Sequence, residues 1–164
     1  MDFESIFYFV LIITFIDIAY NIFMEKEGFT ILRKNGLKLT KARMEIYAFL
    51  KDTVSHPSAF DVFENVKKKL PGISYATVYN VLNKFLEKGL IQELSSFDNK
   101  KRFDGNTEPH IHLICPECGR IEDVPFVNSK EKLEIIAKKR GWQIKKYDLN
   151  VYGIPKNYKK NKTL

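Results

Sequence analysis

Three histidines and two acidic residues carry most of the metal-binding potential of this chain. His110 and His112 form an H-x-H pair in a run that predicts a β-strand, where alternate side chains point to the same face. Two imidazoles are therefore expected side by side. Asp104 and Asp123 lie close by in sequence, and mixed His and Asp donors suit divalent iron, manganese or zinc. His56 stands before a proline, a setting in which a lone histidine is more often a surface or capping residue than a ligand.

The only two cysteines, Cys115 and Cys118, form one C-x-x-C motif directly after the histidine pair. Two closely spaced thiols do not resemble a secreted disulfide framework. A reducing compartment is therefore expected, and we expect the protein to be cytoplasmic.

The 164-residue chain is basic, and its charge is unevenly distributed. The net charge is +7, but residues 1–23 hold three acids and no Lys or Arg, so residues 24–164 carry +10. A basic body suggests a polyanionic partner, most commonly nucleic acid, although a membrane surface also fits. The length allows at most two small domains.

Residues 1–23 form an apolar extension. Its uninterrupted apolar run is shorter than the roughly 20 residues that span a bilayer, and Asp17 would be costly inside one. The acidic start is also wrong for a secretory signal. Three interpretations remain: a weak membrane anchor, an extra helix packed on the protein, or a stretch that is not made because translation starts at Met24. We favour the third, and a membrane partner is expected only if the extension is an anchor.

Helices and a hairpin are expected to position the candidate donors of residues 24–105. Thr40, Ser58 and Ser74 are typical helix-capping residues. The third helix is expected to carry Phe60, Phe63, Val66 and Leu70 on its apolar face. The predicted elements are helices over residues 25–35, from Thr40, over 59–70 and over 74–88, then strands over 90–94 and 101–103.

The second to fourth helices and the hairpin predict a winged helix-turn-helix DNA-binding domain over residues 24–105. A smaller α/β domain is expected over residues 106–155, before a basic tail at 156–164, so the fold class is α+β. The second domain is predicted to contain strands over 111–115 and 120–124, a helix over 129–139 and a strand over 143–151.

The helix over residues 74–88 takes the position of a recognition helix in the major groove. Its polar face offers groups for base edges, because Asn can bond adenine and Tyr can meet a thymine methyl. The alternative is that this face is simply solvated. The expected base-facing residues are Tyr75, Thr77, Tyr79, Asn80 and Asn83, and the expected phosphate contacts are Lys38, Lys41, Arg43, Lys100 and Lys101.

Several motifs in order resemble the ferric uptake regulator (Fur) superfamily, from about Thr30 to Gly153. Within the superfamily the chain most resembles the peroxide-sensing PerR branch, because Asp104 stands where iron-sensing members tend to have another residue. The motifs are H-P-S-A at 56–59, S-Y-A-T-V-Y-N-V-L at 74–82, R-F-D at 102–104, H-I-H at 110–112, C-P-E-C-G at 115–119 and I-E-D at 121–123.

The resemblance implies a repressor that binds a palindromic double-stranded operator as a homodimer through its second, dimerisation domain. It also implies a regulatory Fe(II) or Mn(II), with Zn(II) possible, and peroxide-driven oxidation of His56 or His110 that releases the DNA. The alternatives are a reversible sensor of iron, manganese or zinc availability and a non-heme iron enzyme. We expect no enzymatic activity. The implied metal ligands are His56, Asp104, His110, His112 and Asp123.

One departure from the family concerns zinc. Fur-type proteins usually hold a structural zinc with two C-x-x-C pairs, but here Pro155 and Tyr158 occupy the second pair's positions. Cys115 and Cys118 therefore cannot complete a four-cysteine site within one chain. They could be free thiols, a redox pair, a weak zinc site completed by other donors, or remnants on a turn. A dimer must then depend more on apolar packing.

Overall fold

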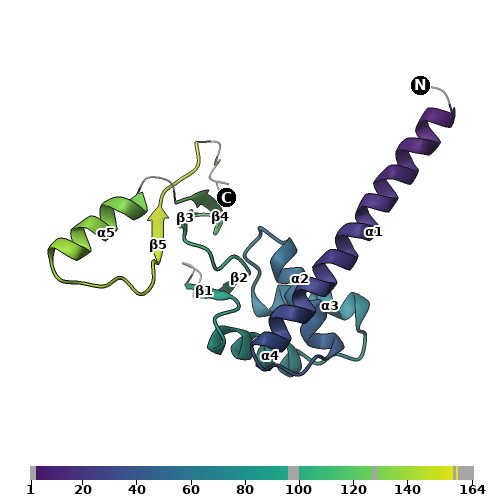
Figure 1. Cartoon of the computed structure of the whole chain (residues 1–164), viewed down its shortest axis with the longest axis horizontal. Helices are drawn as coiled ribbons and strands as arrows, with labels where there is room; N and C mark the ends of the chain where they lie inside the picture. The colour runs from purple at the N-terminus through teal and green to yellow at the C-terminus, as the bar shows by residue number, and fades with distance from the viewer. Residues whose placement is uncertain (1–2, 96–99, 127–128, 157, 159–164) are drawn as a thin grey trace, which may run out of the picture.

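The structure is a computed structural model that describes residues 3–95, 100–126, 129–156 and 158. A helical lobe carries a small β-hairpin, and a three-stranded sheet with one helix forms a second lobe beside it (Figure 1). The described elements are α1 Phe3–Lys34, α2 Lys41–Asp52, α3 Ala59–Lys69, α4 Tyr75–Glu87, β1 Gln92–Ser95, β2 Lys101–Asp104, β3 His110–Ile114, β4 Ile121–Pro125, α5 Ser129–Lys139 and β5 Leu149–Tyr152.

Short polar residues begin α2, α3 and α4, which confirms the predicted caps. The side chains of Thr40, Ser58 and Ser74 each accept a hydrogen bond from the backbone N–H three residues further on. Asp61 reciprocates by accepting from the backbone N–H of Ser58, which completes a capping box. The caps fix where each helix starts, and therefore which face each presents to the core.

One apolar core joins α1, α2, α3, α4 and the hairpin β1–β2. The predicted face of α3 is confirmed for Val66, which is buried, and for Phe63 and Leu70, which pack against the core. It is wrong for Phe60, which is 60% exposed, because the helix also buries Ala59 and Val62. Apolar residues occupy two overlapping helical stripes there, so periodicity alone did not select the buried one. The smaller Ala and Val side chains allow α3 to approach α2 and α4 closely.

The two sheets confirm the α+β class. β1 and β2 pair antiparallel as a wing, and residues 96–99 of its turn lie outside the described residues. In the second lobe the strand order is β4-β3-β5, with β3 antiparallel to β4 and parallel to β5. The predicted strand over 143–151 is too long, because Leu149 already pairs with Ile111 near the start of β3. Only His110 of β3 precedes that pair, so residues 143–147 have no part of β3 to pair with.

A single helix, α1, covers both the apolar extension and the predicted helix over residues 25–35. Its C-terminal part packs on the core through Gly28 and Leu32, whereas Phe7 and Phe15 are 57% and 73% exposed. The side chains of the extension that the structure describes, at residues 6–8 and 11–15, are exposed, and the interpretation as a packed helix stays a prediction. Within the described residues, no helix combines the length and apolarity that a membrane crossing requires. A translation start at Met24 stays a prediction.

Candidate functional site

His56 reaches the site because its loop pairs with the edge of β2. The backbone N–H of Phe103 donates to the carbonyl of Pro57 over 2.9 Å, and Ser58 bridges to Arg102. This pairing places His56 beside Asp104 at the end of β2. His56 also has a φ of 49°, which is rare for a residue other than glycine and is a form of strain that clusters at functional sites.

His110 and His112 lie on one buried face of β3, as the alternation predicts. Their exposed fractions are 8% and 4%, and their Nε2 atoms lie 2.8 Å apart. The Nδ1 of His110 contacts the carbonyl oxygen of Glu108 at 2.7 Å, which orients the ring with Nε2 toward its neighbour. The β3–β4 register sets Asp123 opposite His112. Two adjacent strands thus bring three donors to one end of the sheet.

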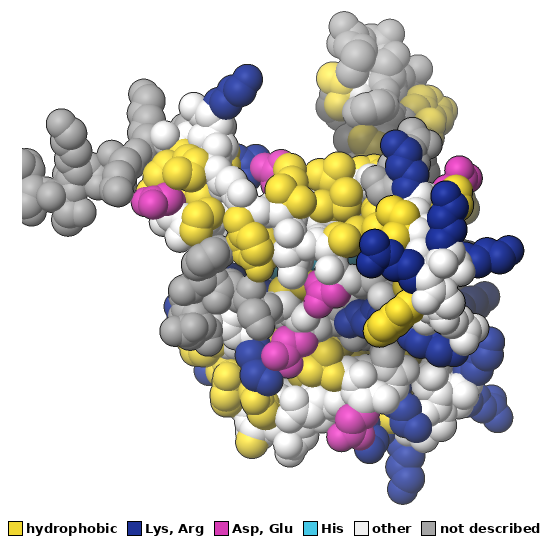
Figure 2. All heavy atoms as spheres, turned by 90° about the vertical axis from the view of Figure 1, so that its left-hand side faces the viewer, with side chains coloured by type: hydrophobic (Ala, Val, Ile, Leu, Met, Phe, Trp, Pro, Cys, Tyr) yellow, Lys and Arg dark blue, Asp and Glu magenta, His cyan; other side chains and the backbone are white. Residues whose placement is uncertain are grey.

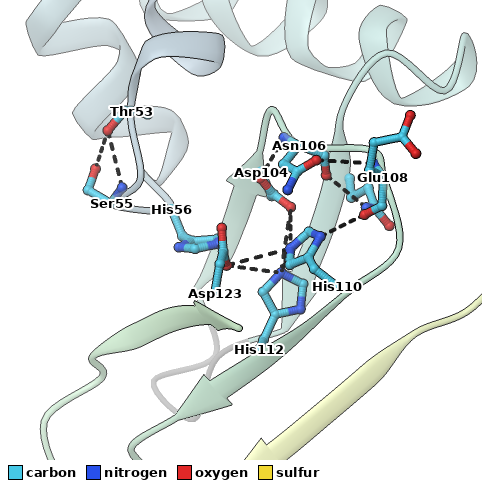
Figure 3. A network of polar contacts seen from close by, with 10 residues as sticks. Thr53, Ser55, His56, Asp104, Asn106, Glu108, His110, His112 and Asp123 are labelled. Atoms are coloured by element: carbon cyan, nitrogen blue, oxygen red, sulfur yellow. Dashed lines mark hydrogen bonds and ion pairs between the residues drawn. The ribbon is translucent and has the colours of Figure 1, made fainter. Parts of the chain in front are cut away.

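All five predicted donors meet where the two lobes face each other (Figure 3). His56, Asp104, His110 and His112 each offer a donor atom within 4.8 Å of the others. The Oδ2 of Asp104 lies 3.2 Å from Nε2 of His110. Asp123 joins them through Oδ1, which lies 2.8 Å from Nε2 of His56 and 3.5 Å from Nε2 of His110. The helical lobe contributes two donors and the sheet lobe three.

Unsatisfied polar atoms show that this cluster suits a cation. Among the described residues, Nδ1 of His56 and of His112 are buried without a hydrogen-bond partner, and His56 Nε2 and Asp104 Oδ2 make no hydrogen bond beyond the close contacts within the cluster itself. Such atoms are costly unless something compensates them. Two carboxylates would neutralise a divalent ion, and imidazole and carboxylate donors suit iron, manganese and zinc. The donor set therefore fits the predicted metal, although ligation by these residues stays a prediction.

The protonation states also favour metal binding. Burial lowers the pKa of His56 below its ordinary value, against the opposing effect of the Asp123 and Asp104 carboxylates. Burial would raise the pKa of Asp104, but the His112 imidazole and the backbone N–H of Asn106 hold that pKa below its ordinary value. A neutral imidazole and an ionised carboxylate are the forms that bind metal.

The backbone next to Asp104 is held against α2 by Lys51 and Gly105, two residues that the sequence analysis missed. The Nζ of Lys51 donates to the carbonyl of Gly105 over 2.6 Å. A Cβ on Gly105 would lie 2.1 Å from the carbonyl oxygen of Leu50, so only glycine allows this approach. Asp104 Oδ1 in turn accepts the backbone N–H of Asn106 over 2.7 Å. A glycine directly after the R-F-D step was the available sequence signal.

We expect Gly105→Ala to destabilise the fold by about 1–3 kcal/mol, the usual cost of overpacking, and to weaken metal binding because it displaces Asp104. Urea unfolding of the apo-protein and Mn(II) titration measure the two effects. Gly72→Ala is the matched control, since nothing lies within 4 Å of its added Cβ. Equal stability and metal affinity in the two variants would show that this contact does not support the site.

The candidate recognition helix presents most of its predicted face to solvent. Tyr75 is 45% and Tyr79 36% exposed, Thr77 and Asn80 are exposed, and Asn83 is half-buried. Thr77 Oγ1 also lies 2.8 Å from Ser74 Oγ, so its hydroxyl takes part in the helix cap. Base contact by this face stays a prediction.

The predicted phosphate-binding residues differ in how they are held. Lys38, Lys41 and Lys100 are exposed. Arg43 is half-buried and donates to the carbonyl of Lys38 over 2.7 Å, and Lys101 pairs with Glu93 at 3.0 Å. Lys41 and Arg43 lie in the first turn of α2 and Lys38 in the loop before it, whereas Lys100 and Lys101 belong to the wing.

The two cysteines lie on the turn between β3 and β4, away from this cluster. Cys115 is buried, Cys118 is exposed, and both are free thiols. Their turn is closed by the backbone N–H of Gly119, which donates to the carbonyl of Cys115 over 2.9 Å. In the described part of the chain, the cluster of metal donors found contains neither cysteine.

Comparison with known proteins agrees with this geometry. Residues 34–152 match the sequence profile described as the ferric uptake regulator family. The peroxide operon regulator of Bacillus subtilis is 36% identical over 129 residues, which cover 79% of this chain and 89% of that protein. The Campylobacter jejuni peroxide stress regulator has a similar structure, with a TM-score of 0.65 and 36% identity over 80% of this chain and 97% of that one. The Pseudomonas aeruginosa ferric uptake regulator with manganese gives a TM-score of 0.70 at 27% identity, over 79% and 98% of the two chains.

Proposed function

Because the chain belongs to the ferric uptake regulator family, we propose that it is a metal-dependent transcriptional repressor that senses peroxide. The observation that carries this proposal is the five-donor cluster shared between the DNA-binding lobe and the sheet lobe. The relatives described above are regulators, and the role of this chain is likewise regulatory and not enzymatic.

His56 and Asp104 belong to the helical lobe, while His110, His112 and Asp123 belong to the sheet lobe. Holding all five together restricts how the lobes sit relative to each other, and so where α4 is presented to DNA. Iron(II) bound here would activate hydrogen peroxide: in the net reaction one imidazole would gain an oxygen atom and lose two electrons, and the peroxide would be reduced to one molecule of water. His56 and His110, whose side chains meet Asp123 at 2.8 and 3.5 Å, are the imidazoles proposed to be oxidised. An oxidised imidazole binds less well, which frees the helical lobe.

The proposed partner is a palindromic operator bound by a homodimer in the cytoplasm. A two-fold dimer places two recognition helices on two half-sites, so the operator mirrors the symmetry of the protein. The sheet lobe supports the dimer, because apolar side chains are exposed on the face seen from the α5 side (Figure 2). In the described part of the sheet lobe, the large exposed apolar side chains are Leu113, Ile135, Ile136, Trp142, Val151, Tyr152 and Ile154.

Exposure of the Fe(II)-loaded protein to hydrogen peroxide, after anaerobic loading, tests the proposal. We expect peptide mass spectrometry to find one added oxygen atom on the peptide containing His56 or His110, with parallel loss of operator binding. The Mn(II)-loaded protein is the control and should keep its mass and its DNA affinity. If neither histidine gains oxygen, peroxide sensing is wrong, while metal-dependent DNA binding can still stand.

A reversible sensor of metal availability is the second candidate. It is favoured by the partial exposure of Asp123, whose side chain is 28% accessible and could let an ion exchange with solvent. Operator binding titrated with Fe(II), Mn(II) and Zn(II), each without oxidant, separates the two functions. For a sensor of availability, operator binding should change within the physiological concentration range of one ion. It should return to its starting value when that ion is removed.

A further inference from the structure

The proposed metal centre is nearly closed to solvent. His56, Asp104, His110 and His112 are at most 8% exposed, whereas the side chain of Asp123 is 28% exposed. A solute that reacts at the centre must therefore reach it through a defined opening. Asp123 marks the side on which such an opening lies.

A polar cavity of about 350 Å³ adjoins the two carboxylates of the centre. Its volume is many times the roughly 30 Å³ that one water molecule occupies in the liquid. Hydrogen-bond donors and acceptors surround it on several sides. The residues that line it include Lys51, Thr53, Val54, Asp104, Asn106 and Asp123.

The walls of this cavity are fixed by hydrogen bonds. Thr53 Oγ1 lies 2.8 Å from Ser55 Oγ and accepts the backbone N–H of Ser55, which stiffens the loop that leads to His56 (Figure 3). Lys51 and Gly105, which also line the cavity, are joined by a 2.6 Å hydrogen bond from Nζ to the carbonyl oxygen. Val54 is 82% exposed, so its side chain stands at the rim and contributes little to the core.

We propose that this cavity is the access route by which small hydrophilic peroxides reach the centre. The inference rests on the proposed peroxide-sensing function. Hydrogen peroxide both donates and accepts hydrogen bonds, so the lysine, threonine and amide groups of the wall can replace its water. An organic hydroperoxide with a bulky apolar group gains no such compensation. The route therefore selects small hydrophilic peroxides over larger ones.

A second cavity, of about 230 Å³, adjoins the histidines of the centre and provides the rival route. It is lined by His110 and His112, and Thr107 contributes an exposed side chain to it. The two candidate ligands that line this second cavity, His110 and His112, are both buried. The cavity beside the carboxylates is lined by Asp123, the one candidate ligand with substantial exposure, and we therefore favour that cavity as the route.

Two rim substitutions distinguish the routes, Val54→Trp at the carboxylate cavity and Thr107→Trp at the histidine cavity. Each Fe(II)-loaded protein is mixed with hydrogen peroxide or tert-butyl hydroperoxide, and the rate of oxygen addition to the histidine peptides is followed. We expect Val54→Trp to slow the hydrogen peroxide reaction severalfold at unchanged Fe(II) affinity, and Thr107→Trp to react as the wild type does. The wild type should react faster with hydrogen peroxide than with tert-butyl hydroperoxide. Val54→Trp should increase the ratio of these two rates, because the narrower opening hinders the larger peroxide more.

A wild-type rate in Val54→Trp, or slowing confined to Thr107→Trp, would overturn the proposed route. Val54→Phe gives the same test with a smaller change should the Trp variant fold poorly. Water proton relaxation by the Mn(II)-loaded proteins supplies a readout without peroxide, and Val54→Trp should weaken it. If the wild type gains no oxygen, peroxide sensing fails, while the relaxation data still decide whether this cavity admits solutes.

Discussion

Replacing His56 with alanine is expected to abolish metal-dependent operator binding while both lobes stay folded. Loss of a group that merely orients a ligand costs about 10–100-fold in metal affinity, so loss of a proposed ligand should cost more. His56 also connects the lobes, because its Nε2 lies 2.8 Å from Asp123 of β4. Without it, the sheet lobe keeps three donors, but the helical lobe keeps only Asp104. Metal titration and operator binding with and without Mn(II) measure both effects.

The fold should tolerate this change, since Nδ1 of His56 has no hydrogen-bond partner among the described residues and Nε2 gives up only its 2.8 Å contact with Asp123, whose side chain is 28% exposed. His56→Asn provides a second variant, because asparagine adopts positive φ more readily than alanine does. Ser55→Ala is the matched control: it alters the same loop without removing a candidate donor. If His56→Ala bound Mn(II) and operator as tightly as Ser55→Ala, His56 would not connect metal binding to DNA binding.

Strand periodicity was sufficient to predict the histidine pair. An H-x-H step needs only a period of two to place both imidazoles on one face, and β3 buries His110 and His112 while leaving Leu113 41% exposed. Local chemistry was likewise enough for the caps of α2, α3 and α4 and for α5, whose bounds match the prediction. These features depend on contacts within a few residues.

The remaining features depend on pairing between distant segments. His56 meets Asp104 only because Pro57 accepts a hydrogen bond from Phe103, and no local pattern contains that contact. The support of Gly105 by Lys51 spans 54 residues and was missed for the same reason. The family resemblance supplied the ligand set, but it did not supply Lys51. The length of β5 was also set by its partner, since β3 determines where pairing begins.

Operator affinity is expected to depend steeply on salt. A dimer that offers Lys38, Lys41 and Arg43 twice makes six phosphate contacts, and Lys100 and Lys101 of the two wings could raise the number to ten. Each contact releases condensed counterions, so such a complex loses about 10³–10⁵ in affinity between roughly 50 and 200 mM salt. Lys101 must first leave Glu93, which lies 3.0 Å away, so the lower end of that range is the better expectation.

Two exposed residues separate charge from base recognition. Lys41→Ala should flatten the plot of log affinity against log salt by about 2 per dimer, since each phosphate contact contributes a slope of about −0.9. Asn80→Ala should leave the slope unchanged and weaken specific binding by about 1–3 kcal/mol per half-site, the usual value of a paired hydrogen bond to a base. Fluorescence anisotropy with Mn(II), on operator and on scrambled DNA, measures both. An Asn80→Ala variant that lost equal affinity for both DNAs would place Asn80 on the phosphate backbone and remove its role in reading sequence.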